Sequence, residues 1–410
     1  MKLKLHWQIF IAMGAGTAFA LLFPEQVPYI APLGVIFMRL LRMVIVPLIM
    51  TSIISGVAGI GDSRSLGRLG GKTFAYYATT SMLAILIGLS VTNLIQPGAG
   101  VEIAQEQRIH PDDLEKPGSV SDILLRIIPL NPIGAAAEGD VLSIIFFSII
   151  FGFAITRLPD KHSKTLQNFF NAAFSAMMTL TTSLIKLAPL GVLGLIANAV
   201  AGMGFDLFAA VGKYMLTITI GLSIHFLIVL PAMFYLFTKR NPLVHYRALA
   251  SVMVFAFSSS SSAATLPLTM KTMENNVGVS NKVSSFVLPM GATVNMDGTA
   301  LYEMAGVLFI AQALGIDLTL TQQIIMAVTA LLASVGAAAV PSAGLVMIFI
   351  VLEAVNITTP AAYAMVGVML GVDRPLDMFR TVVNVTSDSI GAAIIAQSEG
   401  EQLTYKSTAK

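Results

Sequence analysis

The sequence contains no cysteine and a single tryptophan, and charged residues make up only 11% of its 410 positions. Without cysteine, disulfide bonds and thiolate metal sites are excluded. The charges nearly cancel, at +2, so neither a nucleic-acid-binding surface nor an acidic partner is indicated. Apolar residues are abundant: 56% of the chain is hydrophobic and the mean hydropathy is +0.81, more apolar surface than one soluble core can bury. This composition predicts a polytopic membrane protein.

Long apolar segments recur along the whole chain. Eight are candidates for transmembrane helices, near residues 7–23, 31–60, 73–96, 121–157, 167–202, 204–237, 281–315 and 359–397. Two more, near 248–277 and 322–355, are interrupted at their centres by small residues and proline, which favours helix pairs that enter the membrane and turn back. The sequence therefore predicts an all-α membrane protein with eight transmembrane helices and two re-entrant helical hairpins that form inverted repeats.

The charges in the loops predict the orientation. Lysine and arginine gather in three loops, at 64–72, 157–164 and 239–247, and these belong on the cytoplasmic side, whereas the acidic segment 97–120 belongs outside. With eight spanning helices, both termini are then cytoplasmic. The first apolar segment has no small-residue cleavage motif, so it is interpreted as a spanning helix and not as a signal peptide.

The last apolar segment carries a stripe of polar residues. Asp373, Asp377, Arg380, Asn384 and Asp388 are spaced i, i+4, i+7, i+11 and i+15, which places them on one face of a helix. Each ionised side chain at mid-bilayer costs about 2.5–3.5 kcal/mol, so such residues face protein, ions or water. The stripe has three acids against one arginine, and cations would balance the excess. It predicts a site for charged solutes; the alternative is a set of pairs that only join helices.

Three further motifs carry polar groups within apolar segments. Ser258 to Pro267 reads SSSSSAATLP, whose hydroxyls and freed amides suit a broken helix that binds a carboxylate; the alternative is a polar linker. Asn295 to Thr299 reads NMDGT, where Gly298 permits a break and the oxygens suit a hard monovalent cation; the alternative is a kinked structural helix. Tyr77, Thr80 and Ser81 form a weaker trio, because membrane hydroxyls often bond their own backbone.

These motifs resemble those of the glutamate transporters, the family of dicarboxylate/amino acid:cation symporters. The resemblance rests on four motifs in the family's order and covers essentially the whole chain. They are SSSSSAATLP at 258–267, NMDGTALYE at 295–303, AVPSAG at 339–344 and DMFRTVVNVTSD at 377–388.

The resemblance implies a role for individual residues of the substrate site. Backbone groups of the two hairpin tips would hold the substrate, at Ser260, Ser262, Val340 and Gly344. Asp377 would take the ammonium group, and Arg380, supported by Thr299, would form a forked pair with the side-chain carboxylate. Thr381 and Asn384 would complete the pocket around the main-chain end.

The resemblance also implies three sodium sites. The first would use Asp388 with backbone at Gly291, Asn295 and Asn384. The second would use the side chains of Asp297, Asn295, Tyr77, Thr80 and Ser81. The third would be lined by backbone near Met296, at Thr293, Ser334, Val335 and Ala337. Sodium would then be co-transported.

Some positions differ from the family's pattern or need another interpretation. The extra arginine that relatives carry is replaced here by Ser260 and Met378, which leaves potassium counter-transport in doubt. Glu303 matches a glutamate of proton-coupled relatives, and a buried carboxyl can carry a proton; the alternative is an acid that is permanently hydrogen-bonded within the bundle. His225 is interpreted as a packed, hydrogen-bonded histidine and not as a ligand, because no second ligand has suitable spacing.

The resemblance implies a sodium-coupled symporter for acidic amino acids that works by an elevator motion. It would be a homotrimer in contact with membrane lipids in a prokaryotic plasma membrane. Residues 1–72 would form scaffold helices one and two, and 121–203 scaffold helices four and five. Residues 73–120 would form transport-domain helix three with an outer loop, and 204–410 the remaining transport domain. Such a protein is not an enzyme.

Three alternatives remain. A transporter of neutral amino acids would share the fold, but Arg380 argues against it. A transporter of C4-dicarboxylates would also share it, but Asp377 and the serine-rich hairpin argue against that. A channel that conducts anions would use the same polar residues without saturable uptake. The sequence does not separate aspartate from glutamate, because both present the same two carboxylates to Arg380, and it does not give the ion stoichiometry.

Overall fold

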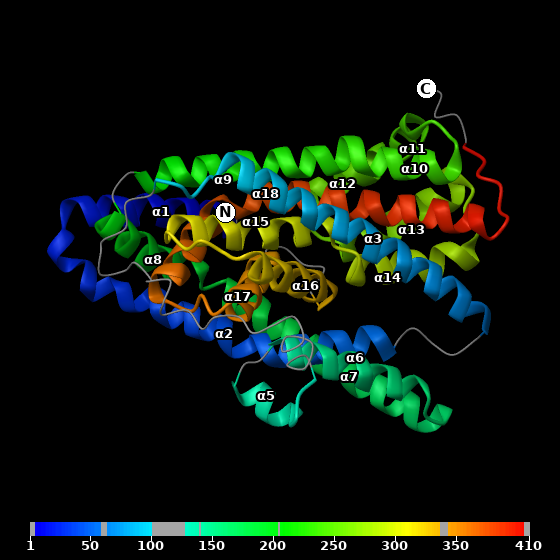
Figure 1. Ribbon diagram of the computed structural model, residues 1–410, viewed down its shortest axis with the longest axis horizontal. Helices are drawn as coiled ribbons and strands as arrows, with labels where there is room; N and C mark the ends of the chain where they lie inside the picture. The colour runs from blue at the N-terminus through cyan, green and yellow to red at the C-terminus, as the bar shows by residue number, and fades with distance from the viewer. Residues whose placement is uncertain are drawn as a thin grey trace.

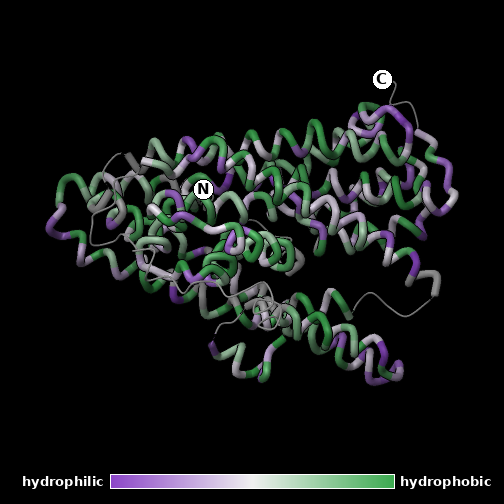
Figure 2. Tube along the Cα trace, viewed as in Figure 1, coloured by the Kyte–Doolittle hydropathy of each residue, from purple (hydrophilic) through white to green (hydrophobic). Residues whose placement is uncertain are grey.

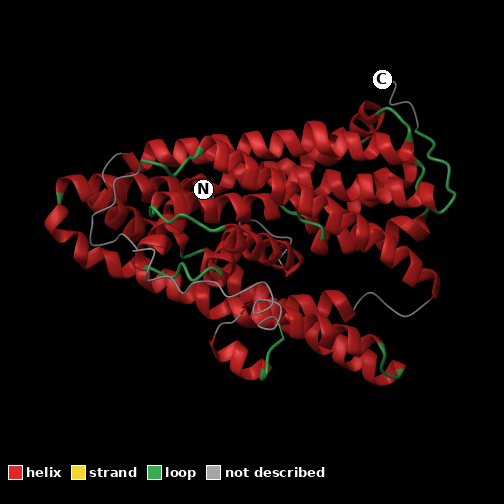
Figure 3. Ribbon diagram, in the orientation of Figure 1, coloured by secondary structure: helices red, strands yellow, loops and turns green. Residues whose placement is uncertain are grey.

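All regular structure in the described part of the chain is helical. The computed structural model describes residues 5–58, 64–100, 128–138, 141–203, 206–336 and 343–405. Within these ranges the helices pack into one elongated molecule (Figure 1), and no strand occurs (Figure 3). The predicted all-α class is confirmed in this coarse form.

One set of helices, which we call the α2 group, packs around the long second helix, with α1 attached to it through α8. It consists of α1 (Leu5–Leu22), α2 (Val27–Ala58), α6 (Val141–Thr156), α7 (Asp160–Ile185) and α8 (Ala188–Met203). The short η1 (Pro24–Gln26) joins α1 to α2, and α5 (Pro132–Glu138) precedes α6. Glycine allows the close contact of α2 with α8: a Cβ on Gly194 would lie 2.6 Å from the Ile30 carbonyl oxygen and 2.8 Å from the Gly34 nitrogen.

The second set, which we call the central bundle, surrounds α15 and α18. Its longer helices are α3 (Arg64–Ile95), α9 (Asp206–Ile224), α14 (Asn281–Val294), α15 (Asp297–Ala313), α16 (Leu320–Gly336) and α18 (Pro360–Ser398). Its shorter elements are η4 (His225–Val229), α10 (Leu230–Thr238), α11 (Pro242–Ala248), α12 (Ala250–Ser259), α13 (Ser262–Thr272), η5 (Met273–Val277) and α17 (Ala343–Ala354). α15 packs against α3, α16, α17 and α18 and is buried along nearly its whole length. The bundle thus has a helix at its centre that lipid does not reach.

The helices break where the sequence predicts breaks. α14 and α15 are separated at Asn295 and Met296, and α12 and α13 are separated at Ser260 and Ser261. Ser260 has the left-handed φ of 49°, and the Ser261 hydroxyl caps α13 by accepting from the Ala264 N–H at 3.2 Å. The residues between α16 and α17 lie outside the described part.

One predicted segment is divided. Residues 167–202 were expected as a single apolar span, but α7 ends at Ile185 and α8 begins at Ala188. Pro189 explains the interruption, because it has no N–H to donate to the carbonyl of Ile185.

Few helices reach membrane-spanning length by apolar composition alone. Among the described residues, Arg68–Ile95 and Ala209–Thr238 are long and apolar enough, and a third span exists if Ile11–Leu22 and Pro24–Phe37, bent by 113°, are taken together. Figure 2 shows hydrophobic residues along the helices and hydrophilic ones at several of their ends. The eight spanning helices and the re-entrant course of the hairpins stay predictions.

Candidate functional site

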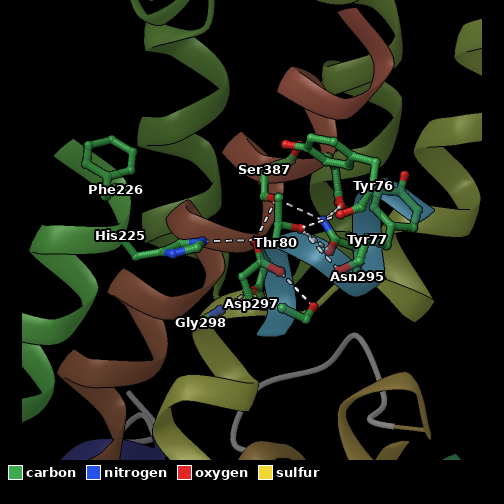
Figure 4. A network of polar contacts seen from close by, with 12 residues as sticks. Tyr76, Tyr77, Thr80, His225, Phe226, Asn295, Asp297, Gly298 and Ser387 are labelled. Carbon is green, nitrogen blue, oxygen red and sulfur yellow. Dashed lines mark hydrogen bonds and ion pairs between the residues drawn. The ribbon is translucent and has the colours of Figure 1, made fainter. Parts of the chain in front are cut away.

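Asp297 is the centre of a buried network of polar groups. It begins α15 directly after the helix break, and its side chain is fully buried. Its Oδ1 accepts from the Ser81 hydroxyl at 2.7 Å, and its Oδ2 accepts from the Ser387 hydroxyl at 2.7 Å (Figure 4). Groups of α3, α15 and α18 thus meet on one carboxylate beside the helix break.

Asn295 connects this carboxylate to the second acid of the bundle. Its amide donates to the Asp388 carboxylate at 2.9 Å and to the Ser387 hydroxyl at 3.0 Å, and its Oδ1 lies 3.4 Å from the Thr80 hydroxyl. Tyr77 lies alongside (Figure 4), with its hydroxyl donating to the Val287 carbonyl at 2.8 Å. The predicted residues of the first two ion sites are therefore gathered in one place.

At Gly291 the backbone of α14 comes very close to the side chains of Asp388 and Tyr77. A Cβ there would lie 2.5 Å from both the Asp388 Oδ1 and the Tyr77 hydroxyl. Only glycine leaves room for the α14 backbone beside these oxygens. Within the described ranges, neither Asp297 nor Asp388 forms an ion pair with lysine or arginine. The two carboxylates and the neighbouring hydroxyls offer oxygen ligands of the kind that suit a monovalent hard cation.

The third predicted ion site is described only in part. Met296 is buried between α14 and α15, and the Ser334 hydroxyl donates to the Leu331 carbonyl at 2.9 Å within α16. Thr293 and Val335 lie at the ends of α14 and α16, and their side chains are not described. Ala337, and Val340 of the substrate site, lie outside the described residues.

His225 is the site residue that the sequence did not assign. A π-helical turn, η4, interrupts the rod of α9 and α10 at this position, a feature frequent at functional sites. The His225 Nε2 lies 3.0 Å from the Asp297 Oδ2, and both side chains are fully buried (Figure 4). The interpretation as a packed, hydrogen-bonded histidine is confirmed, but its partner is the carboxylate at the centre of the ion network.

Arg380 forms the second polar centre. Its Nη2 donates to the Asp373 Oδ1 at 2.8 Å and to the Asp377 Oδ1 at 2.9 Å, and Arg380 is 1% exposed. The guanidinium carbon lies 3.8 Å from the ring centroid of Tyr302, a cation–π contact from α15. Its Nε and Nη1 have no hydrogen-bond partner among the described residues. The polar stripe on α18 is therefore present. The edge of the Arg380 guanidinium that carries Nε and Nη1 is open to an acceptor.

The two centres are joined through Asn384. Its Oδ1 accepts from the Gly298 N–H at 2.8 Å, and its Nδ2 donates to the Thr299 hydroxyl at 3.3 Å. Thr381 donates its hydroxyl to the Asp377 carbonyl at 2.8 Å, within α18. Asn384 therefore holds the first turn of α15 to α18. This contact lies between the ion network and the side chain of Arg380.

The hairpin residues contribute small groups. A Cβ on Gly344, at the start of α17, would lie 2.6 Å from the Arg380 Nη1 and 3.0 Å from the Thr299 Cγ2. Ser260 and Ser262, on either side of the tip of the first hairpin, are buried, and the Ser260 hydroxyl has no partner in the described part. Gly344 therefore borders the open edge of Arg380.

Glu303 lies two turns into α15 and is fully buried. Neither carboxylate oxygen has a hydrogen-bond partner among the residues that the structure describes. The described contacts thus give no support to the alternative of a permanently hydrogen-bonded acid.

The described part of the chain is all-helical and buries several charged side chains inside a helical bundle. A sequence model described as the Sodium:dicarboxylate symporter family matches residues 5–398, and this chain belongs to that family. Members of the family are transporters, so the prediction that the protein is not an enzyme is confirmed.

The curated relatives include both acidic and neutral amino acid transporters. The Proton/sodium-glutamate symport protein of Geobacillus stearothermophilus is 34% identical over 98% of this chain and 96% of its own length. The Proton/glutamate-aspartate symporter of Escherichia coli (strain K12) is 32% identical over 97% and 94%. The human Neutral amino acid transporter B(0) is 36% identical over 93% and 76%. Overall sequence identity therefore does not distinguish acidic from neutral substrates. The substrate has to be inferred from the residues of the site.

Proposed function

We propose that this protein is a cation-coupled symporter that imports acidic amino acids, aspartate or glutamate, with sodium. The observation that carries the proposal is Arg380, which is buried on the same helix face as Asp377 and has an open guanidinium edge. A substrate with an ammonium group and two carboxylates matches these charges. The names of the bacterial relatives support sodium and proton coupling to glutamate.

Sodium has a clear electrostatic reason to bind with the substrate. Asp297 and Asp388 are buried and contact no lysine or arginine among the described residues, although Asp297 contacts His225, and a cation offsets the cost of burying them. Asn384 and the first turn of α15 connect these acids to the substrate residues. Ion and substrate binding should therefore be cooperative, each raising the affinity for the other by the same factor.

The acidic substrate is favoured over a neutral one because its side-chain carboxylate would pair with the Nε and Nη1 of Arg380, which have no hydrogen-bond partner among the described residues. Breaking a buried ion pair costs about 3–5 kcal/mol, which corresponds to about two to four decades in affinity. Asp377 supports an amino acid over a C4-dicarboxylate, because its carboxylate, which pairs with Arg380 at 2.9 Å and with Arg374 at 3.7 Å, would attract a substrate ammonium group and repel another carboxylate. Channel-like anion conduction remains the alternative from another class.

We further propose the family's mechanical arrangement. The α2 group corresponds to the predicted scaffold helices within 1–72 and 121–203, and the central bundle to the transport domain within 73–120 and 204–410. The bundle carries the site residues that the structure describes, so it would move across the membrane as one body with its cargo. A homotrimer in the plasma membrane with cytoplasmic termini completes the proposal.

The decisive experiment is uptake of labelled aspartate and glutamate into proteoliposomes. Sodium, proton and potassium gradients are imposed one at a time, with equal ion concentrations on both sides as the control. Uptake that saturates and requires an inward sodium gradient is expected. Current without saturable uptake would favour the channel, and uptake of alanine or serine at the aspartate rate would favour the neutral transporter.

Proton coupling is assigned to Glu303, because this buried acid has no hydrogen-bond partner in the described part and because the resemblance of its motif to the family implies a glutamate of proton-coupled members at this position. Glu303→Gln should abolish the response to an imposed pH gradient while sodium-driven uptake or exchange remains. A wild-type protein that ignores the pH gradient would disprove the proton role. The same series of imposed gradients tests potassium counter-transport.

A further inference from the structure

Asp373 is a buried acid for which the proposed binding scheme has no use. Asp377 is assigned to the substrate ammonium and Arg380 to the substrate carboxylate, but the Arg380 Nη2 also bonds the Asp373 Oδ1 at 2.8 Å. Both side chains are 1% exposed. The Arg380 guanidinium is therefore already paired with a protein carboxylate when no substrate carboxylate is bound.

The ion pairs of Asp373 do not join helices. Asp373, Asp377 and Arg380 all belong to α18, at i, i+4 and i+7, so their ion pairs stay within one helix. The carboxylate also faces the Tyr302 hydroxyl of α15, but its Oδ2 forms no hydrogen bond of normal geometry among the described residues. A role in holding the bundle together thus has no support from its ion pairs.

Asp373 is also not needed to support the plane of the guanidinium. The Tyr302 ring lies 3.8 Å below the Arg380 Cζ, and Gly344 lies at the Nη1 edge. Asp377 holds the same Nη2 at 2.9 Å. The contribution that only Asp373 makes is a second negative charge beside Arg380 in a dry surrounding, where charge interactions are strong.

We propose that Asp373 is a specificity-determining residue that shares Arg380 with the substrate's side-chain carboxylate. The inference rests on the proposed function. Asp373 partly neutralises Arg380 and so reduces the attraction of Arg380 for an incoming carboxylate, which weakens the preference for acidic over neutral side chains. It lets the site bind and release an acidic substrate instead of holding it as a permanent ion pair.

The test compares aspartate with asparagine, which has nearly the same shape without the side-chain charge. Both compete with labelled aspartate for the protein in proteoliposomes, and the ratio of their inhibitory concentrations reports the preference. In Asp373→Asn the amide oxygen still accepts from Arg380 while the charge is gone. We expect the asparagine-to-aspartate ratio to rise by about tenfold, mainly because aspartate binds more tightly.

Two variants show whether the effect passes through Arg380. In the Arg380→Cys background, Asp373→Asn should change the ratio by less than twofold, because no guanidinium is left to share. Asp317→Asn makes the same substitution at an exposed acid between α15 and α16 and should leave the ratio unchanged. If Asp373→Asn does not give a monodisperse protein, Asp373→Ser removes the same charge with a smaller side chain.

The outcomes separate this inference from the proposed function. A wild-type protein that binds neither amino acid disproves the proposed function, and the role of Asp373 with it. A wild-type protein that prefers aspartate, combined with a ratio that stays constant or falls in Asp373→Asn and Asp373→Ser, disproves the role of Asp373 alone. An equal rise in the Arg380→Cys background also overturns it.

Discussion

The α2 group and the central bundle bury different kinds of polar residue. In the described part of the α2 group, the buried polar side chains are hydroxyls, at Ser143, Ser148, Ser163 and Thr181. The central bundle buries charged residues as well, at Asp297, Glu303, Asp373, Asp377, Arg380 and Asp388. Membrane helices that only pack need small residues and neutral hydroxyls. Charges are kept at such a depth where something charged is bound, so the comparison separates a packing region from a binding region.

The largest expected effect comes from removing the arginine of the central bundle. Arg380→Cys should lower the affinity for aspartate by about two to four decades and let serine or alanine bind through Asp377. Competition assays with aspartate and serine measure both changes. The matched change in the α2 group is Arg157→Cys, at an exposed position after α6, which should keep the aspartate preference.

The absence of cysteine sharpens this experiment. Arg380→Cys introduces the only thiol in the chain, so an aminoethyl thiol reagent restores a positive charge at one place. We expect partial recovery of the acidic preference after labelling. An aspartate preference that survives the substitution would show that Arg380 is not the selectivity residue.

The next effect concerns the ion network. Asp388→Asn should raise the sodium concentration needed for half-maximal uptake by about 10- to 100-fold, the range typical when a group that orients a bound metal is lost. Linkage should weaken aspartate binding at fixed sodium as well. Titration of sodium against binding measures both. Asp160→Asn, at the exposed start of α7, is the control, and an unchanged sodium dependence in Asp388→Asn would remove Asp388 from the ion site.

A third substitution acts on packing alone. Gly194→Val places a side chain against the backbone of α2, so it should destabilise the protein by about 1–3 kcal/mol. The asparagine-to-aspartate ratio should not change, since no site residue lies in the α2 group. Gly14→Val, where a Cβ meets open space, is the control. Thermal unfolding and competition are measured together, and a changed ratio would contradict the separation of the two regions.

The smallest effect is a pH dependence at the end of the central bundle. Burial lowers the pKa of His245 from 6.5 to about 3, and its ring nitrogens contact the Tyr405 hydroxyl at 2.8 Å and the Ser389 hydroxyl at 3.2 Å. The unfolded state binds the proton first, so this stability is complete above pH 6.5 and declines as the pH falls towards 3. At pH 5.5 the loss is about 1.4 kcal/mol.

His245→Gln should therefore make the unfolding midpoint less sensitive to pH between 7.5 and 5.5. Thermal unfolding at several pH values gives the slope for each variant. His162→Gln, an exposed histidine of α7, should retain the wild-type slope. Equal slopes in all three proteins would mean that His245 does not titrate between the folded and unfolded states in this range.

Local patterns predicted much of the central bundle. The stripe on α18 follows from helical periodicity, and the break at Asn295 and Met296 follows from Gly298 and the polar run around it. Both depend only on residues close together in the sequence. The interruption between α7 and α8 was not predicted, because the sequence is apolar on both sides of Pro189 and hydropathy does not register a single proline.

Contacts between distant residues were not predictable in this way. His225 lies 72 positions before Asp297, and nothing in its own segment indicates a π-helical turn that brings it to that carboxylate. Ser387 gives no signal of its own in the sequence, because a membrane serine commonly bonds its own backbone, whereas here it donates to Asp297. Tyr302 reads as an ordinary aromatic core residue until its ring is seen beneath Arg380.

The continuity of α18 restricts how this protein can change. The helix runs for 39 residues without a break, about 58 Å, and carries its polar residues at fixed angular positions. One residue inserted between Asp373 and Asp388 would turn everything beyond it by about 100° and carry part of the stripe away from α15. Substitutions keep that register and insertions destroy it. New selectivity in this chain is therefore accessible through single exchanges on α18, while variation in length is confined to its two ends.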